Sequence, residues 1–212
     1  MVPDLRSLSA QTEAICALAR WCAARGWVPA TSGNFSVRDT LTGRMEISRS
    51  GLDKGQITPA DFIEMDAQGR VIGGDGKPSS ETGLHQVIYR DRPKVHAIAH
   101  VHTVWNTLLS ARCEGVGYVD MRGYELLKAL SGVSTHAHRE RVPVIANSQD
   151  YSALAGELTA ALALNPAAHG VLLSGHGLYT WGTSVAEARR HLEALEFLFE
   201  AEYRRQSVAP GS

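Results

Sequence analysis

The most informative part of the sequence is the stretch Val95-His96-Ala97-Ile98-Ala99-His100-Val101-His102. It contains no Gly or Pro and is followed by Thr103, so it predicts a β-strand and then a capped helix through Leu109. Side chains alternate between the faces of a strand, which places His100 and His102 on one face with Cα atoms about 6.6 Å apart. The two imidazoles could bind one metal ion, or they could cap the strand and hydrogen-bond to neighbours.

A third histidine lies in a predicted turn between two apolar stretches, 170–173 and 178–181. The intervening Ser174-Gly-His-Gly177 is typical of a hairpin turn, and glycines beside His176 would let a ligand approach the backbone. We predict His176 as the third metal ligand; the alternative is an exposed hairpin tip. Three neutral imidazoles leave positions open on a divalent ion, as in a catalytic site.

Three short segments, at 31–34, 50–54 and 78–80, combine hydroxyl groups, glycines and polar side chains. The last one precedes a helix predicted from Ser80 to Arg92, whose unpaired N–H groups would favour an anion. Each segment alone is more often a turn or a helix cap, so the prediction rests on their joint presence in one small domain. The residues that we predict to bind a phosphate are Ser32, Gly33, Asn34, Ser50, Gly51, Lys54, Ser79 and Ser80.

Two acidic residues lie near these segments. Glu81 falls in the first turn of the helix after Ser80, and Glu125 opens a helix predicted over 124–131. Either carboxylate could carry out acid–base chemistry, or it could only stabilise the helix by interacting with the positive end of the helix dipole.

Strands and helices alternate irregularly along the rest of the chain. Periodicity predicts helices over 4–25, over 152–164 and from Ser184 onward, and short strands and turns over 35–65. Val142-Pro-Val-Ile145 predicts a strand whose proline lies at the sheet edge or among its first residues. Because there is no strict βαβ order, we expect a mixed sheet between helices, as a single domain over 1–212.

Composition excludes several classes of function. The net charge of −1 gives no basic surface for nucleic acid or a membrane, and no apolar run approaches transmembrane length. The N-terminus lacks the apolar core of a secretory signal, and three cysteines, an odd number, favour a reduced setting. We therefore expect a cytoplasmic protein with a small-molecule substrate.

The order of these motifs resembles that of the class II aldolase/adducin family along nearly the whole chain. The matching segments are Thr31–Asn34, Ser50-Gly51, Pro78–Glu81, His100–His102 and Ser174–Gly177. The resemblance implies a three-layer α/β/α fold with a largely antiparallel central sheet. It also implies zinc or a similar ion on the three histidines, a sugar-phosphate substrate, and a homotetramer with sites near subunit interfaces.

Within the family, Ser50–Lys54, Gly123–Lys128 and His176–Gly182 resemble a dehydratase. Sugar-phosphate aldolases typically carry a Tyr-Ala-Thr-Phe-Gly-like stretch where this chain has Arg122-Gly-Tyr-Glu125. The resemblance therefore implies a lyase that removes water from a ketose 1-phosphate.

The acid–base role in such a lyase falls to Glu125, with Glu81 as a helper or a substrate hydrogen-bond partner. Two alternatives remain open. One is an aldolase for a fuculose- or ribulose-type phosphate, because Glu81 lies where aldolases keep their catalytic acid. The other is a non-catalytic interaction domain, as in the adducin head.

Overall fold

The computed structural model describes residues 8–208 and builds its centre from one sheet of nine strands, in the order β4-β3-β2-β1-β5-β9-β8-β7-β6. The strands are β1 (Asn34–Arg38), β2 (Met45–Ser48), β3 (Phe62–Met65), β4 (Val71–Gly73), β5 (Ala97–Val101), β6 (Tyr118–Arg122), β7 (Arg139–Ile145), β8 (Gly170–Leu173) and β9 (Gly177–Gly182). All neighbours are antiparallel except β7 and β8. The predicted mixed, largely antiparallel sheet is confirmed.

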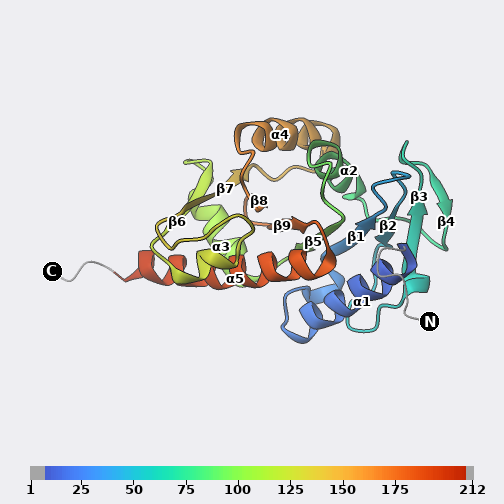
Figure 1. Ribbon diagram of the computed structural model, residues 1–212, viewed down its shortest axis with the longest axis horizontal. Coiled ribbons are helices and arrows are strands. Elements are labelled where there is room, and N and C mark those ends of the chain that lie inside the picture. The colour runs from blue at the N-terminus through green and yellow to red at the C-terminus, as the bar shows by residue number, and fades with distance from the viewer. Residues whose placement is uncertain (1–7, 209–212) are drawn as a thin grey trace.

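Helices cover both faces of this sheet (Figure 1). The α-helices are α1 (Leu8–Ala24), α2 (Thr82–Asp91), α3 (Val104–Cys113), α4 (Tyr151–Leu164) and α5 (Val185–Ser207), and the 3₁₀ turns are η1 (Pro29–Thr31), η2 (Pro59–Asp61) and η3 (Glu125–Ala129). Helices α2 and α4 pack on one face, and α1, α3 and α5 on the other. The three-layer α/β/α architecture is therefore confirmed.

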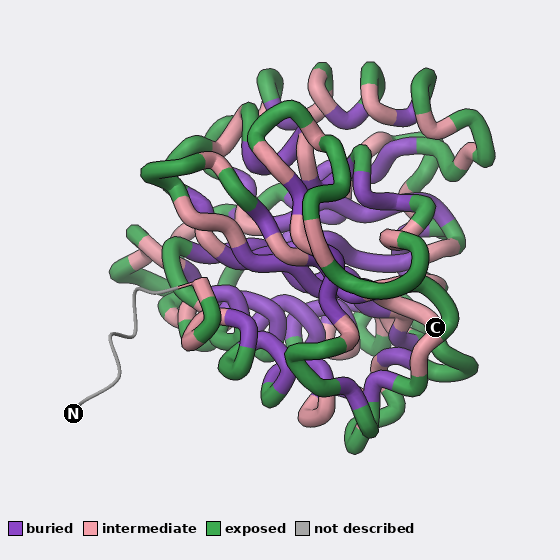
Figure 2. The backbone as a smooth tube through the Cα atoms, turned by 90° about the vertical axis from the view of Figure 1, so that its right-hand side faces the viewer, coloured by how far each residue is buried: buried purple, intermediate pink, exposed green. Residues whose placement is uncertain are grey.

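Burial is concentrated in the sheet and in the helix faces turned toward it (Figure 2). Strand β5 is buried at all five positions, as a central strand covered on both faces should be. On α5, Leu192, Leu195 and Phe199 have no exposed surface and form the predicted apolar stripe. No helix within residues 8–208 is long and apolar enough to cross a membrane.

Strand β5 brings distant parts of the chain together. Its His100 pairs with Asn34 of β1 on one side and with Tyr179 of β9 on the other. The ladder to β9 ends where Val101 pairs with Leu178. The site described below lies at this end of the three strands.

Two local expectations need correction. The helix expected over 124–131 is the short 3₁₀ turn η3, because Gly123 has φ of +79° and Leu130 is extended, which leaves too few residues for an α-helix. Both predicted placements of Pro143 are wrong: β7 lies between β6 and β8 and not at the sheet edge, and Pro143 is the fifth residue of that strand and not among its first. The ladder to β8 covers Val144 and Ile145, past the proline, so the missing N–H interrupts no bond of that ladder.

Apart from η3, the predicted helix boundaries hold to within two residues where the structure describes them, except that α3 continues to Cys113, four residues past the predicted end at Leu109. Helix α2 begins at Thr82 rather than Ser80 and ends at Asp91. Residues 4–7 of the first predicted helix lie outside the described residues. Thr103 caps α3 and Ser184 caps α5, both as predicted.

Candidate active site

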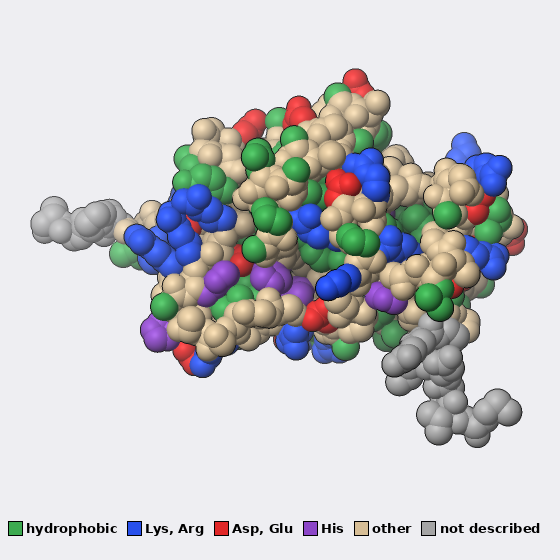
Figure 3. All heavy atoms as spheres, turned by 45° about the horizontal axis from the view of Figure 1, so that its top comes forward, with side chains coloured by type: hydrophobic (Ala, Val, Ile, Leu, Met, Phe, Trp, Pro, Cys, Tyr) green, Lys and Arg blue, Asp and Glu red, His purple; other side chains and the backbone are tan. Residues whose placement is uncertain are grey.

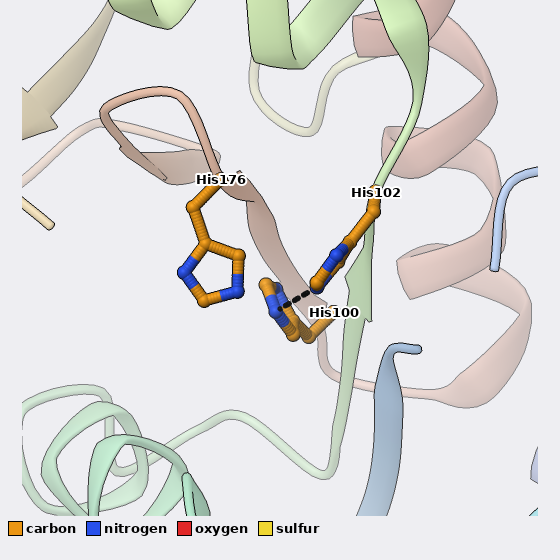
Figure 4. A group of neighbouring side chains, drawn as sticks. All are labelled: His100, His102 and His176. Carbon is orange, nitrogen blue, oxygen red and sulfur yellow. Dashed lines mark hydrogen bonds between the residues drawn. The ribbon is translucent and has the colours of Figure 1, made fainter. Parts of the chain in front are cut away.

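The structure brings the three predicted histidines together. His100 comes from β5, His102 follows its end, and His176 comes from the turn between β8 and β9 (Figure 4). One ring nitrogen of each lies within 4.8 Å of the others. The Nε2 atoms of His100 and His102 are 2.8 Å apart. The same-face argument from strand geometry thus holds, although His102 lies just past the strand.

Hydrogen bonds on the outer side orient two of these rings. Nδ1 of His100 lies 3.0 Å from the carbonyl oxygen of Leu178, and Nδ1 of His176 lies 3.1 Å from Oδ1 of Asn147. Both partners are acceptors, so each Nδ1 donates its proton and each Nε2 keeps a lone pair directed toward the cluster. This is the usual arrangement around a metal-binding histidine. Asn147 was not predicted from the sequence.

Burial and mutual proximity keep the imidazoles neutral. Burial, followed by the nearby His102 and His176, lowers the pKa of His100 well below its usual range. Burial, His176 and the Lys54 ammonium lower the pKa of His102 to about 4. The pKa of His176 is also lowered, mainly by burial. Three neutral nitrogen donors fit a divalent metal ion without prior loss of protons.

Gly177 allows the chain after the turn to approach His100 and His102 closely. A Cβ atom on Gly177 would lie 2.5 Å from the carbonyl oxygen of Val101 and 3.0 Å from carbon atoms of both His100 and His102. The contact with backbone cannot relax cheaply, so only glycine fits there. The sequence argument for a close approach at this glycine agrees with the geometry.

Glu81 lies against the histidine cluster. Its carboxylate oxygens are 3.3 Å from Nε2 of His100 and 3.3 Å from Nε2 of His176. Nδ2 of Asn34 donates to the same carboxylate at 2.7 Å, and Oδ1 of Asn34 bonds to Nε2 of the buried His85. Asn34 therefore orients Glu81 through its side chain, a use that differs from the predicted phosphate contact.

A cavity of about 150 Å³ opens beside Glu81 and the histidines. It is lined by Thr31, Ser32, Gly33, Asn34, Arg49, Ser50, Gly51, Lys54, Ser79, Glu81, His102 and His176. All the residues predicted to bind a phosphate are here except Ser80, whose hydroxyl lies 3.4 Å from that of Tyr151. Histidine side chains and basic side chains share one face of the molecule (Figure 3).

The cavity contains groups suited to an anion. Lys54 is only 2% exposed, and its Nζ donates to the carbonyl oxygens of Thr31 at 2.9 Å and Leu52 at 3.0 Å. The Ser32 hydroxyl and Nε of Arg49 are buried without a hydrogen-bond partner among residues 8–208. Unpaired buried donors next to a cation would be satisfied by an anionic ligand. Arg49 was missed, although it directly precedes the Ser50-Gly51 turn.

Tyr179 is a third residue of the site, after Asn147 and Arg49, that the sequence did not indicate. Its ring stacks on His100, with centroids 3.8 Å apart, and its hydroxyl is fully buried. Burial and then the Glu81 carboxylate raise the pKa of this hydroxyl well above its usual range. It therefore stays protonated beside the acid.

Glu125 lies away from the cavity and the histidine cluster. It is exposed on η3, forms an ion pair with Lys128, and has an oxygen 3.8 Å from Nδ1 of His136. It does not line the cavity described above. One copy of the chain thus brings Glu81, but not Glu125, to the histidines.

The fold and this site place the chain in a known class of proteins. It belongs to the family described as "Class II Aldolase and Adducin N-terminal domain", whose sequence model matches residues 13–203. The sequence is similar to that of methylthioribulose-1-phosphate dehydratase from Methylococcus capsulatus, with 49% identity over 189 residues, 89% of this chain and 91% of the relative. The enzyme of that name from Sorangium cellulosum is 43% identical over 195 residues, 92% of each chain.

Solved structures show the same fold. An L-fuculose 1-phosphate aldolase superposes with a TM-score of 0.81 at 24% identity, covering 97% of this chain and 91% of the other. The L-fuculose-1-phosphate aldolase from Thermus thermophilus gives a TM-score of 0.73 at 26% identity, covering 96% of this chain and 98% of the other.

Proposed function

We propose that this chain is a metal-dependent lyase that removes water from 5-methylthioribulose 1-phosphate, giving 2,3-diketo-5-methylthiopentyl 1-phosphate in methionine salvage. The observation that carries this proposal is the similarity to two dehydratases of that name, at 49% and 43% identity over nearly the whole of each chain. The joint presence of a histidine cluster, an acid and an anion-suited cavity in one site supports it.

The metal would be held by His100, His102 and His176, one ion per subunit. We infer zinc, because three neutral imidazoles are a common ligand set of catalytic zinc. When bound, the ion would supply an electrophile that withdraws electrons from the substrate carbonyl and stabilises the negative charge that develops there. The outer hydrogen bonds of His100 and His176 would orient these ligands for that task.

The phosphate would bind in the cavity next to the cluster. Its proposed ligands are Ser32, Gly33, Ser50, Gly51, Lys54 and Ser79, which line that cavity; of the other residues predicted from the sequence, the Asn34 side chain is bound to Glu81 and Ser80 lies outside the lining. The Lys54 ammonium and the unpartnered Ser32 hydroxyl would take up phosphate oxygens, and Arg49, which forms an ion pair with Asp61 through another nitrogen, would offer its unpartnered Nε. Anchoring the phosphate there would direct the carbonyl end of the substrate toward His102 and His176, which line the same cavity.

Dehydration needs a base at C3 and an acid at the C4 oxygen. The C3–H and C4–O bonds break, a C3–C4 double bond forms, the hydroxyl leaves as water, and the resulting enol becomes the 2,3-diketone. We propose Glu125 as the acid–base residue, with Glu81 as a helper or a substrate hydrogen-bond partner. Because Glu125 is exposed and remote within one chain, it would serve the site of a neighbouring copy. A homotetramer with sites near subunit interfaces would bring Glu125 of one copy to the site of another.

A sugar-phosphate aldolase of the fuculose or ribulose type is the second candidate. It is favoured by the position of Glu81 against the histidines and by the fold shared with L-fuculose-1-phosphate aldolase. Such an enzyme would break C3–C4 rather than C4–O. An adducin-like interaction domain would have no use for three convergent imidazoles, so the cluster favours an enzyme.

The deciding experiment presents the metal-loaded protein with 5-methylthioribulose 1-phosphate and, separately, with L-fuculose 1-phosphate. A diketone that retains the phosphate supports the dehydratase. Release of an aldehyde from the second substrate supports the aldolase, and turnover of neither contradicts both. His102→Ala, which removes a ligand, serves as the control for metal-dependent turnover.

A further inference from the structure

The turn that carries His176 needs support beyond the backbone ladder of the sheet. The last pair between β5 and β9 is Val101 with Leu178, so His102 and His176 both lie past the end of that ladder. Glycines flank His176, and Gly175 has φ of +61°. Since glycine loses more conformational freedom than other residues on ordering, other contacts must hold the turn in place.

Helix α3 supplies such contacts from one side of its surface. Thr107 and Ser110 are three residues apart and therefore share a face. Oγ1 of Thr107 shares its proton between the carbonyl oxygen of His176 at 3.3 Å and Oδ1 of Asn106 at 3.4 Å. Oγ of Ser110 accepts the N–H of Gly175 at 3.1 Å. Ser110 is fully buried, and its own hydroxyl proton goes to the Thr107 carbonyl oxygen at 3.0 Å. Both hydroxyls are thus committed to the turn and to the helix.

The same face continues to Glu114, four residues beyond Ser110, at the end of α3. Oγ of Ser174 donates to Oε2 of Glu114 at 2.6 Å. Three consecutive residues of the turn, 174–176, therefore each hydrogen-bond to a side chain of this helix face. We call Thr107, Ser110 and Glu114 the α3 clamp.

The other end of α3 is fixed next to His102, which leads directly into the helix (Figure 4). Thr103 caps the helix and Asn106 completes the capping box. Both donate to the buried carboxyl of Glu196 on α5, from Thr103 Oγ1 at 2.5 Å and from Asn106 Nδ2 at 2.8 Å. One rigid helix therefore connects the chain after His102 with the turn that holds His176.

We propose that the α3 clamp positions His176 against His102 and His100, with Ser110 as its central positioning residue. The ring centroids of His176 and His102 are 4.6 Å apart, and the clamp sets that separation from a shared helix. Partners behind metal ligands commonly change metal affinity by about 10- to 100-fold when removed. The proposal rests on the proposed metal function of the three histidines.

The test measures metal binding directly, with Co²⁺ as a spectroscopic probe. Ser110→Ala removes the acceptor for the Gly175 N–H; we expect the dissociation constant for Co²⁺, from chelator competition, to rise about 10-fold or more. The visible absorption of bound Co²⁺ changes with the ligand geometry. In the metal-free protein, hydrogen–deuterium exchange over 174–177 becomes faster.

Three further variants separate positioning from folding. Glu114 is exposed, so Glu114→Ala leaves the fold intact and weakens Co²⁺ binding, whereas Glu114→Gln keeps an acceptor for Ser174 and restores it. Thr159→Ala, on α4 across the sheet, removes a helix hydroxyl away from the site and serves as the matched control.

The outcomes distinguish this proposal from the one on which it rests. Unchanged Co²⁺ affinity and absorption in both Ser110→Ala and Glu114→Ala, with the unsubstituted protein binding Co²⁺ through its histidines, would overturn the positioning proposal alone. Failure of the unsubstituted protein to bind Co²⁺ at those histidines would overturn the proposed metal function and the clamp with it.

Discussion

The buried carboxyl of Glu196 makes the stability of this protein depend on pH. Glu196 is 3% exposed, and the only hydrogen-bond donors to its carboxyl among the described residues 8–208 are Thr103 and Asn106. Burial raises the pKa of this carboxyl from an ordinary value of 4.5 to about 7. The folded protein therefore holds the proton more tightly than the unfolded chain does.

The sign and size of the effect follow from that difference. Protonated Glu196 makes its full contribution to the unfolding free energy below pH 4.5. That contribution is lost as the pH rises to about 7, because unfolding between these pH values releases the proton. At about 1.4 kcal/mol for each pH unit between the two pKa values, the loss amounts to ~3 kcal/mol of unfolding free energy. It is large beside the total stability of a typical domain.

Glu196→Gln tests this reasoning because the amide has the shape of a protonated carboxyl and never ionises. Urea unfolding is followed for both proteins from pH 4.5 to pH 8, at one protein concentration and with a chelator present. We expect the unsubstituted protein to lose ~3 kcal/mol relative to the Gln variant over this range. Glu193→Gln, an exposed position on the same helix, controls for the loss of a carboxylate as such. Unfolding free energies of the Glu196→Gln and unsubstituted proteins that run parallel over the whole pH range would refute the reasoning.

Other substitutions test the proposed site. His102→Ala should lose bound metal by elemental analysis, and full occupancy would contradict the ligand assignment. Glu125→Gln should abolish dehydration with metal content unchanged; retained turnover would remove Glu125 from the mechanism. Refolding His102→Ala and Glu125→Gln together should restore part of the activity, because mixed oligomers then contain some intact sites. No recovery of activity would argue against a site shared between subunits. Gly177→Ala should cost about 1–3 kcal/mol of unfolding free energy and weaken metal binding, and a fully stable, metal-bound variant would contradict the steric argument.

Local patterns predicted much of the fold. Strand β5 and the β8–β9 hairpin followed from apolar runs and turn residues, and Thr103 and Ser184 were recognisable as helix caps. The helix predicted over 124–131 is longer than the observed η3. The positive φ of Gly123 and the extended conformation of Leu130 bound η3, and neither can be recognised from the sequence. Pro143 was misplaced because sheet order depends on long-range pairing, which no local pattern contains.

The convergence of the three histidines could be anticipated from motif order, but their supports could not. Ser174 and Glu114 are 60 residues apart, and Asn147 and His176 are 29 apart, so their contacts exist only once the chain has folded. Serines and asparagines of this kind are ordinary helix and loop residues in the sequence. Arg49 also depends on the folded chain, because it lines the cavity beside Pro78, with which it forms an isolated β-bridge across 29 residues of sequence.

Strand β5 has a further consequence for how the protein matures. It is paired on one side with β1, whose residues are made early, and on the other with β9, near the end of the chain. A nascent chain that has released β1 and β5 from the ribosome holds two of the three imidazoles, and the third arrives only with the final hairpin. The proposed three-histidine site would therefore form only after the β8–β9 hairpin has been made and β9 has paired with β5.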